Sequence, residues 1–210
     1  MKKLTLLLTE DETLVRQGFA ALLRQEPFCD TLYEAGTGSE TLSVLTEKKI
    51  DILLLDIKLP DIHGLEIVKR MHHENIKTKI LVITGLEGHE LLLNLLHTGI
   101  DGFVPKINGF DEVCLAIRQL QEDGVYFSHE VHKLTAHLKK SKSKAPAVHL
   151  NEKDKVIIES LLTGQTTKQL AGKLNMSERT AETYRRRLLQ KTGTVNTATL
   201  IAYGFRNGII

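Results

Sequence analysis

The chain has 210 residues, of which 41% are hydrophobic and 26% charged, a balance typical of a folded globular protein rather than a disordered one. Its two cysteines, Cys29 and Cys114, lie far apart and show no metal-site spacing, which argues against a disulfide scaffold and favours a reducing, cytoplasmic location. No apolar run approaches the length needed to cross a bilayer, so we expect no membrane partner.

The net charge of +2 hides an asymmetry along the chain. Residues 1–122 hold 13 Lys and Arg against 19 Asp and Glu, residues 123–148 hold 5 against 2, and residues 149–210 hold 10 against 5. The beginning of the chain is therefore acidic and its end basic, so the end suits a polyanionic partner.

The first half alternates short apolar runs with longer segments of helical spacing. The runs expected to be strands are Leu4–Leu8, Thr31–Glu34, Ile52–Leu55, Ile80–Ile83 and Gly102–Val104. The segments expected to be helices are Glu12–Glu26, Ser39–Lys49, Leu65–His73, His89–Thr98 and Phe110–Glu122. This alternation predicts a doubly wound α/β domain over residues 1–122, with a five-stranded parallel sheet covered on both faces. Ligands of such folds bind beyond the carboxyl ends of the strands.

Residues 123–148 are expected to link two domains. They contain a helical pattern at Ser128–Lys139 and a run rich in Lys and Ser over 139–146, which is typical of a flexible tether. The histidines of this segment lack a Cys or carboxylate that would complete a metal-ligand set, so a solvated helix is the favoured interpretation.

Residues 149–210 show only helical patterns, which predicts a small all-α domain. Asn151 and Asp154 have the spacing of a capping box at the start of its first helix. The next two expected helices, Thr167–Leu174 and Ser177–Lys191, are joined by a short connection, as in a helix-turn-helix.

Acidic residues follow two of the predicted strands. Glu10 and Asp11 follow the first strand, and Asp56 follows the third. If both strands lie centrally and parallel, these carboxylates meet at one edge of the sheet. Three carboxylates that close together need a cation, and Mg²⁺ prefers oxygen ligands. An aspartate can also accept a phosphoryl group whose charge the metal neutralises.

Two further polar residues, Thr84 and Lys106, follow the next two strands and could bind phosphoryl oxygens. Each of these residues taken alone is most simply a strand end that enters solvent. Four such positions in chain order, each at a carboxyl end, favour a functional site.

The first half resembles the receiver domain of bacterial response regulators, which has a flavodoxin-like fold. The matching stretches are Thr9–Glu12, Asp51–Gly64, Ile83–Gly85 and Gly99–Lys106. The resemblance implies that Asp56 accepts phosphate from a sensor histidine kinase. It implies that Mg²⁺ is held by Glu10, Asp11, Asp56 and the backbone carbonyl of Lys58. It also assigns a catalytic part to Lys106 and Thr84, and a switching part to Thr84 and Phe103.

Three positions depart from the usual receiver pattern. Glu10 replaces an aspartate, and Phe103 lacks the hydroxyl of a tyrosine. The proline that usually follows the lysine precedes it here as Pro105, where it restricts Val104 and removes an N–H. We therefore expect a differently shaped loop beside Lys106.

The helix expected over Ser177–Lys191 has an apolar back, formed by Ala181, Tyr184 and Leu188, and a polar front. Its front and flanking residues are Arg179, Glu182, Thr183, Arg185, Arg186, Arg187 and Gln190. Such a helix suits the major groove of DNA, where front side chains meet base edges and flanking arginines meet phosphates. A surface helix with an ordinary charged face, or a helix that binds RNA or an acidic protein, is the alternative.

Residues 149–210 also resemble the LuxR-type helix-turn-helix domain of the NarL/FixJ subfamily. The matching runs are Leu150–Asp154, Leu162–Ala171, Leu174–Ala181 and Leu188–Gly193. By this resemblance the base-reading residues would be Glu182, Thr183 and Arg186, and the residues near phosphates would be Lys168 and Lys191. The last helix, near Thr197–Asn207, would carry a dimer face through Leu200, Ile201 and Tyr203.

We therefore predict a transcriptional regulator of a bacterial two-component system rather than a conventional enzyme, with double-stranded DNA, a histidine kinase and a second copy of the chain as partners. One alternative is a Mg²⁺-dependent phosphatase with an aspartate nucleophile, but such enzymes need a second Asp where this chain has Lys58. A receiver that acts independently of phosphate is the other, and Pro105 is the residue that supports it.

Overall fold

The computed structural model describes residues 3–85, 89–122, 124–127, 150–194, 196–206 and 209. The chain divides into two compact units, one made of residues 1–87 and 102–121, the other of residues 88–101 and 122–210. No helix in the described ranges combines the length and the apolar character needed to cross a membrane.

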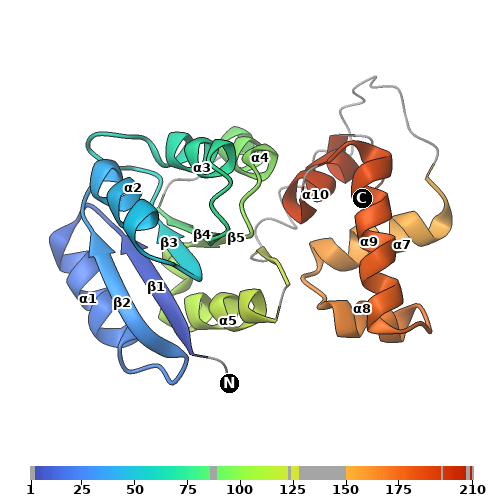
Figure 1. The fold of residues 1–210 in the computed structure, drawn as a ribbon, viewed down its shortest axis with the longest axis horizontal. Helices are drawn as coiled ribbons and strands as arrows, with labels where there is room; N and C mark the ends of the chain where they lie inside the picture. Colours follow the sequence, from blue (N-terminus) through green and yellow to red (C-terminus); the bar gives the residue numbers. More distant parts are fainter. Residues whose placement is uncertain are drawn as a thin grey trace. The chain divides into compact units, whose positions relative to one another are not determined.

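The sheet is the main feature of the first unit (Figure 1). Its strands are β1 (Leu4–Thr9), β2 (Cys29–Ala35), β3 (Ile52–Leu55), β4 (Lys79–Thr84), β5 (Gly102–Pro105) and β6 (Tyr126–Phe127), in the order β2-β1-β3-β4-β5-β6. The pairings from β2 to β5 are all parallel. The carboxyl ends of β1, β3, β4 and β5 therefore lie at one edge of the sheet.

Helices cover both faces of this sheet. They are α1 (Thr13–Leu23), α2 (Gly38–Glu47), α3 (Gly64–His73) and α5 (Phe110–Gln121), with a short 3₁₀ helix, η1 (Lys106–Asn108), between β5 and α5, whereas α4 (His89–Thr98) belongs to the second unit. Helices α1 and α5 lie on one face, where the rings of Phe19 and Phe110 meet edge to face, and α2 and α3 lie on the other (Figure 1). The central strands are accordingly apolar on both faces, and Leu6, Leu7, Leu53 and Leu54 are fully buried.

The predicted doubly wound parallel sheet is confirmed, but the predicted number of strands was wrong. The sheet has a sixth strand, β6, and the Tyr126 amide donates to the carbonyl of Asp101 over 3.0 Å. Two residues are too few to show an alternating pattern, and they fall in the segment expected to be a linker. Periodicity therefore showed no sign of β6.

Among the described residues, the second unit contains α4 and four further helices: α7 (Glu152–Leu162), α8 (Thr167–Lys173), α9 (Glu178–Thr192) and α10 (Thr197–Arg206). The predicted capping box is confirmed, because Asn151 and Asp154 exchange backbone-to-side-chain hydrogen bonds of 3.0 and 2.9 Å. Ser177 caps the start of α9, and Gly193, with φ of 68°, ends it in the left-handed region. Helix α9, the second helix of the helix-turn-helix, therefore has well-defined ends.

Two further expectations concern the last helix and the segment between the two predicted domains. Leu200 and Ile201, which the resemblance places on a dimer face, are fully buried in this structure, and the dimer face itself stays a prediction. The helical pattern at Ser128–Lys139, the charged run over 139–146 and the end of the last helix at Asn207 lie outside the described residues.

Replacing Leu53 with alanine should weaken the fold strongly. Leu53 lies fully buried in the middle of the sheet, so its truncation leaves a cavity and should lower the free energy of unfolding by about 2–5 kcal/mol. Urea denaturation followed by circular dichroism measures this loss. Leu14→Ala is the control: Leu14 is 83% exposed, so its change should stay within about 0.5 kcal/mol. Equal losses in the two variants would contradict the placement of Leu53 in the core.

Candidate functional site

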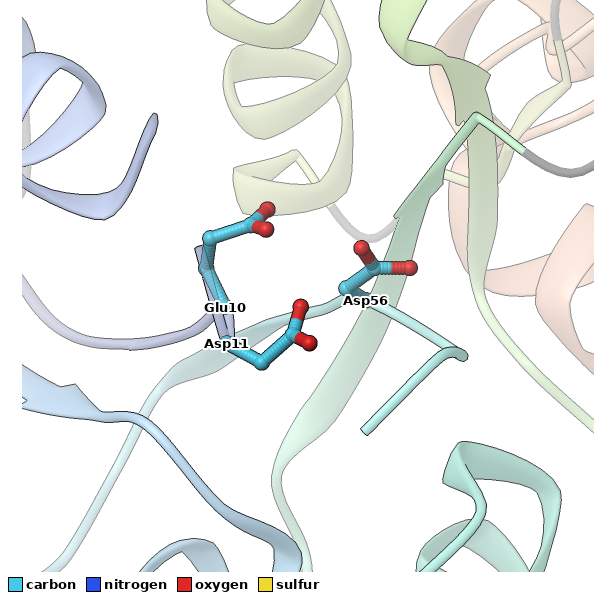
Figure 2. Close-up of side chains that lie close together, drawn as sticks. All are labelled: Glu10, Asp11 and Asp56. Atoms are coloured by element: carbon cyan, nitrogen blue, oxygen red, sulfur yellow. The ribbon is translucent and has the colours of Figure 1, made fainter. Parts of the chain in front are cut away.

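Three carboxylates lie together at the carboxyl ends of β1 and β3 (Figure 2). Glu10 and Asp11 follow β1 directly, and Asp56 follows β3 directly. Each residue offers a carboxylate oxygen within 4.8 Å of the other two. Glu10 and Asp56 are only 4% and 5% exposed, and Asp11 is half-buried. The fold thus brings together the acidic residues that the sequence assigned to this edge.

Lys106, the first residue of η1, places its ammonium between two of these carboxylates. Its Nζ lies 2.6 Å from Glu10 Oε2 and 2.6 Å from Asp56 Oδ2. Backbone amides supply the other hydrogen bonds: Lys58 N–H donates to Asp56 Oδ1 over 3.2 Å, and Glu12 N–H donates to Glu10 Oε1 over 3.3 Å. The Lys106 ammonium therefore forms ion pairs with two of the three clustered carboxylates.

The charges in this pocket shift two pKa values. Burial raises the pKa of the Glu10 carboxyl, and the Asp56 carboxylate raises it further, although Lys106 opposes both effects. Burial alone would lower the pKa of the Lys106 ammonium, but hydrogen bonds and attraction from Asp56 and Glu10 raise it instead. Because the ionised form of Glu10 remains costly beside a charged lysine, the pocket favours additional positive charge. An all-carboxylate donor set fits a hard cation such as Mg²⁺.

The other residues assigned to this site lie at the same edge or in the loop beside it. Thr84 ends β4 and is 1% exposed, and Phe103 lies in β5, opposite Val82 of β4, at 7% exposure. Lys58 is exposed in the loop after β3, with its amide directed at Asp56. The parallel register thus brings residues from four strand ends to one edge of the sheet.

The loop after β3 is tied to the start of α2, a contact that the sequence did not indicate. Asp61 accepts hydrogen bonds from the Ser39 hydroxyl (2.6 Å) and from the amides of Ser39 (2.9 Å) and Gly38 (2.7 Å). These bonds, with the Ser39 hydroxyl foremost, hold the pKa of Asp61 well below its usual range. Gly38 permits the approach, because a Cβ there would lie 2.7 Å from Ile62 Cβ. The loop that follows Asp56 is therefore fixed at its middle.

Helix α9 presents the polar face that its sequence predicted. Ala181 and Leu188 are buried. The exposed residues of the predicted DNA-contacting set on α8 and α9 are Lys168, Arg179, Thr183, Arg186, Arg187 and Lys191. Glu182 is half-buried and pairs with Arg185 Nη2 at 3.0 Å and with Arg186 Nε at 3.5 Å. The front of the helix is thus a set of arginines partly neutralised by one glutamate.

Lys191 has a contact within its own unit that the sequence did not predict. Its Nζ lies 2.6 Å from Oδ2 of Asp154, which is 7% exposed and also belongs to the capping box of α7. Lys191 therefore joins the end of α9 to the start of α7. Its predicted phosphate contact would have to be made from this position.

Replacing Lys106 with methionine should strengthen Mg²⁺ binding. The change removes a positive charge 2.6 Å from two carboxylates, so the pocket loses the group that competes with an added cation. Calorimetric titration with MgCl₂ measures the affinity, and Lys69→Met on the exposed surface of α3 is the control. In EDTA the Lys106 variant should be less stable than wild type, and added Mg²⁺ should narrow the difference. Weaker Mg²⁺ binding by Lys106→Met would contradict this expectation and show that the ammonium helps to hold the carboxylates for the cation.

Two family models match the chain. Residues 6–118 match the response regulator receiver domain, and residues 148–203 match the bacterial regulatory proteins of the luxR family. The first match covers more than half of the chain and contains all the clustered acidic residues. The second contains the helix-turn-helix.

Individual proteins show the same arrangement over nearly the whole length. The transcriptional regulatory protein UhpA of Salmonella typhimurium is 29% identical over 194 residues, which cover 92% of this chain and 93% of UhpA. The nitrate/nitrite response regulator protein NarP of Escherichia coli is 26% identical over 186 residues, 88% of this chain and 86% of NarP. A structure of the Salmonella typhimurium RcsB response regulator shares the fold, with a TM-score of 0.61, 20% identity and coverage of 97% and 98%. The chain therefore belongs to the two-component response regulators of the NarL/FixJ subfamily, in which a receiver domain precedes a LuxR-type helix-turn-helix domain.

Proposed function

We propose that phosphorylation of Asp56 controls DNA binding by this transcriptional regulator. The donor would be a sensor histidine kinase, and the active form a homodimer on double-stranded DNA in the cytoplasm. One observation carries the proposal: Glu10, Asp11, Asp56 and Lys106 meet at one sheet edge in a chain that also presents the basic face of α9. The domains that divide these tasks would be residues 1–122 and 149–210.

In the proposed reaction, a carboxylate oxygen of Asp56 attacks the phosphorus of a phosphohistidine on the kinase, and the P–N bond breaks as the P–O bond forms. Mg²⁺ bound by Glu10, Asp11, Asp56 and the Lys58 carbonyl would neutralise charge on the transferred group. Lys106, now 2.6 Å from Asp56, would transfer its hydrogen bond to a phosphoryl oxygen. The burial of Glu10 and Asp56 keeps water from much of the site.

The phosphoryl group would be sensed through Thr84 and Phe103. Thr84 ends β4, the strand next to β3, and its hydroxyl would bind a phosphoryl oxygen. Phe103 lies on the following strand and is already buried. Phosphorylation would therefore favour a packing in which both residues lie inward, and this packing would alter the faces that the receiver offers to its partners.

The proposed DNA contacts lie on α8 and α9, and most of these side chains are exposed. Glu182, Thr183 and Arg186 would meet base edges, with Arg179 on the same front face of α9, and the residues placed near phosphates would be Lys168, Arg185, Arg187 and Lys191. Glu182 can accept a hydrogen bond from a cytosine amino group, and Arg186 can donate two to guanine.

The structure gives little support to the two alternatives. A phosphatase of the aspartate-nucleophile class would need an acid at position 58, where this chain carries an exposed lysine. A receiver that acts independently of phosphate was suggested by Pro105, which was expected to alter the loop beside Lys106. The Lys106 ammonium nevertheless reaches both Glu10 and Asp56, so Pro105 does not remove it from the site.

Incubation with acetyl phosphate and MgCl₂ should add one phosphoryl group to the wild-type chain and none to Asp56→Asn. The carboxylate is the nucleophile, so its amide should be inert, and EDTA should abolish the adduct. Intact-mass spectrometry detects the adduct directly. Binding to DNA fragments selected from a random pool should tighten on phosphorylation of wild type only. An adduct that persists in Asp56→Asn, or equal DNA affinity with and without phosphate, would overturn the proposal.

Arg186→Ala should weaken DNA binding, whereas Lys191→Met should lower the stability of the fold. Arg186 is 76% exposed at its side chain, so its loss should cost about 1–3 kcal/mol of binding to the selected DNA and leave folding unchanged. Lys191 supports the buried carboxylate of Asp154, so its loss should lower the free energy of unfolding by about 1–3 kcal/mol. Fluorescence anisotropy on labelled DNA and thermal denaturation separate the effects. Equal loss by Arg186→Ala on all DNA sequences would make Arg186 a phosphate contact instead.

A further inference from the structure

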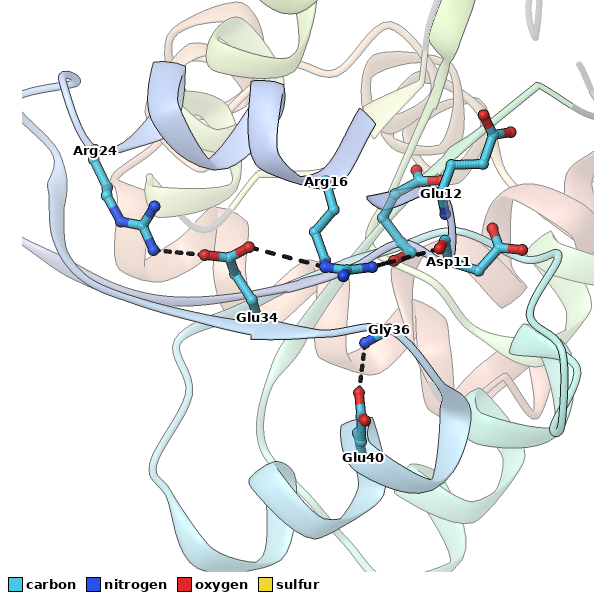
Figure 3. Close-up of polar contacts among 8 residues, drawn as sticks. Asp11, Glu12, Arg16, Arg24, Glu34, Gly36 and Glu40 are labelled. Atoms are coloured by element: carbon cyan, nitrogen blue, oxygen red, sulfur yellow. Dashed lines mark hydrogen bonds and ion pairs between the residues drawn. The ribbon is translucent and has the colours of Figure 1, made fainter. Parts of the chain in front are cut away.

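Arg16, on α1, binds the backbone of the turn that carries two of the three clustered carboxylates (Figure 3). Its Nη1 donates to the carbonyl oxygen of Glu10 over 2.6 Å and approaches that of Asp11 at 3.5 Å. Its Nε lies 3.9 Å from Oε2 of Glu34 on β2. The Arg16 side chain is only 19% exposed, so the guanidinium is largely withdrawn from water.

These contacts fix the backbone of Glu10 and Asp11, here called the acidic turn. A guanidinium is planar and presents its donors in a rigid fork, so it sets the direction as well as the position of the carbonyl groups that it binds. The amide of Glu10 is also held, because it donates to the carbonyl of Ala35 over 3.1 Å. With these contacts in place, the peptide planes of Glu10 and Asp11 have little freedom, and the directions in which both carboxylates project are restricted.

Gly36 leaves the space that the guanidinium occupies. A Cβ at this position would lie 3.2 Å from Arg16 Nη1 and 3.6 Å from Arg16 Cζ. The Gly36 peptide is itself anchored, because its amide donates to Glu40 Oε2 over 2.6 Å (Figure 3). A larger residue would therefore push against Arg16 while the backbone stays in place.

We propose that Arg16 is a positioning residue that sets the affinity of the acidic site for its cation. Arg16 acts through the backbone of Glu10 and Asp11, whose carboxylates must lie beside Asp56 to form one donor set. This role rests on the proposed function, because it concerns the cation that the phosphorylation reaction uses.

Whether the loss of Arg16 weakens or strengthens Mg²⁺ binding distinguishes a positioning role from a purely electrostatic one. If Arg16 acted only as a cation near three carboxylates, it would compete with Mg²⁺, and its removal would tighten Mg²⁺ binding. A group that orients metal ligands acts oppositely: its loss weakens metal affinity, typically about 10- to 100-fold.

The experiment is a calorimetric titration of the full chain with MgCl₂. Arg16→Gln should bind Mg²⁺ about tenfold or more weakly than wild type. Arg16→Lys should recover part of the affinity, because an ammonium can still donate to one carbonyl. Gly36→Ala should also weaken binding, although it keeps the arginine and every charge. Circular dichroism melts in EDTA establish that each variant is folded before titration.

Arg24→Gln is the matched control. Arg24 also pairs with Glu34, at 2.6 Å, but it lies on the far side of that residue from the acidic turn (Figure 3). Arg24→Gln removes the same charge as Arg16→Gln and a contact to the same Glu34 carboxylate. Because it leaves the contacts of Arg16 with the acidic turn in place, the variant should bind Mg²⁺ as tightly as wild type.

Two outcomes would overturn the inference in different ways. If wild type binds Mg²⁺ while folded Arg16→Gln and Gly36→Ala bind it equally or more tightly, the positioning role is wrong and the proposed function stands. If wild type binds no Mg²⁺ and takes no phosphoryl group from acetyl phosphate, both proposals fall.

Discussion

The arrangement of the first unit depends on a balance of charge at the carboxyl edge of its sheet. Parallel strands bring Glu10, Asp11 and Asp56 together, and their mutual repulsion opposes the packing that buries them. Lys106 relieves part of this repulsion by bonding to two of the three carboxylates at once. Burial and, after it, the neighbouring Asp56 carboxylate nevertheless raise the pKa of Glu10, so Lys106 does not offset the whole cost of holding a negative charge there. An added cation would relieve the repulsion that remains among the three carboxylates.

The geometry of the acidic residues is maintained by contacts outside the pocket. Arg16 holds the turn after β1, and Asp61 ties the loop after β3 to α2. Small residues make these close approaches feasible. At Gly64, for example, a Cβ would lie 2.8 Å from Ile57 Cα, so the loop after Asp56 could not close with a larger residue there. The turn after β1 and the loop after β3 are thus held by specific contacts with neighbouring elements.

Most of the fold follows from local pattern, and most of the missed contacts are non-local. The central strands were predictable because burial on both faces requires continuous apolar runs, and the acids at their ends because parallel topology fixes where those ends meet. β6 is too short to show periodicity. The contacts of Arg16 with Glu34 and of Ser39 with Asp61 join different elements, and no spacing within one element signals them. Lys191 was placed near a phosphate by the family resemblance, and the sequence alone did not indicate that Asp154 would lie beside it.

The pairing of Glu182 with two arginines has a consequence for the thermodynamics of DNA association. Cations that bind phosphates release condensed counterions, and this release makes affinity fall as salt rises. An arginine that must first leave an internal carboxylate exchanges one ion pair for another, so its net contribution to this release is smaller. Arg185 and Arg186 both begin in such pairs. The salt dependence of binding should therefore be shallower than the number of basic residues on α9 implies, and a larger share of the affinity would come from contacts that salt does not screen.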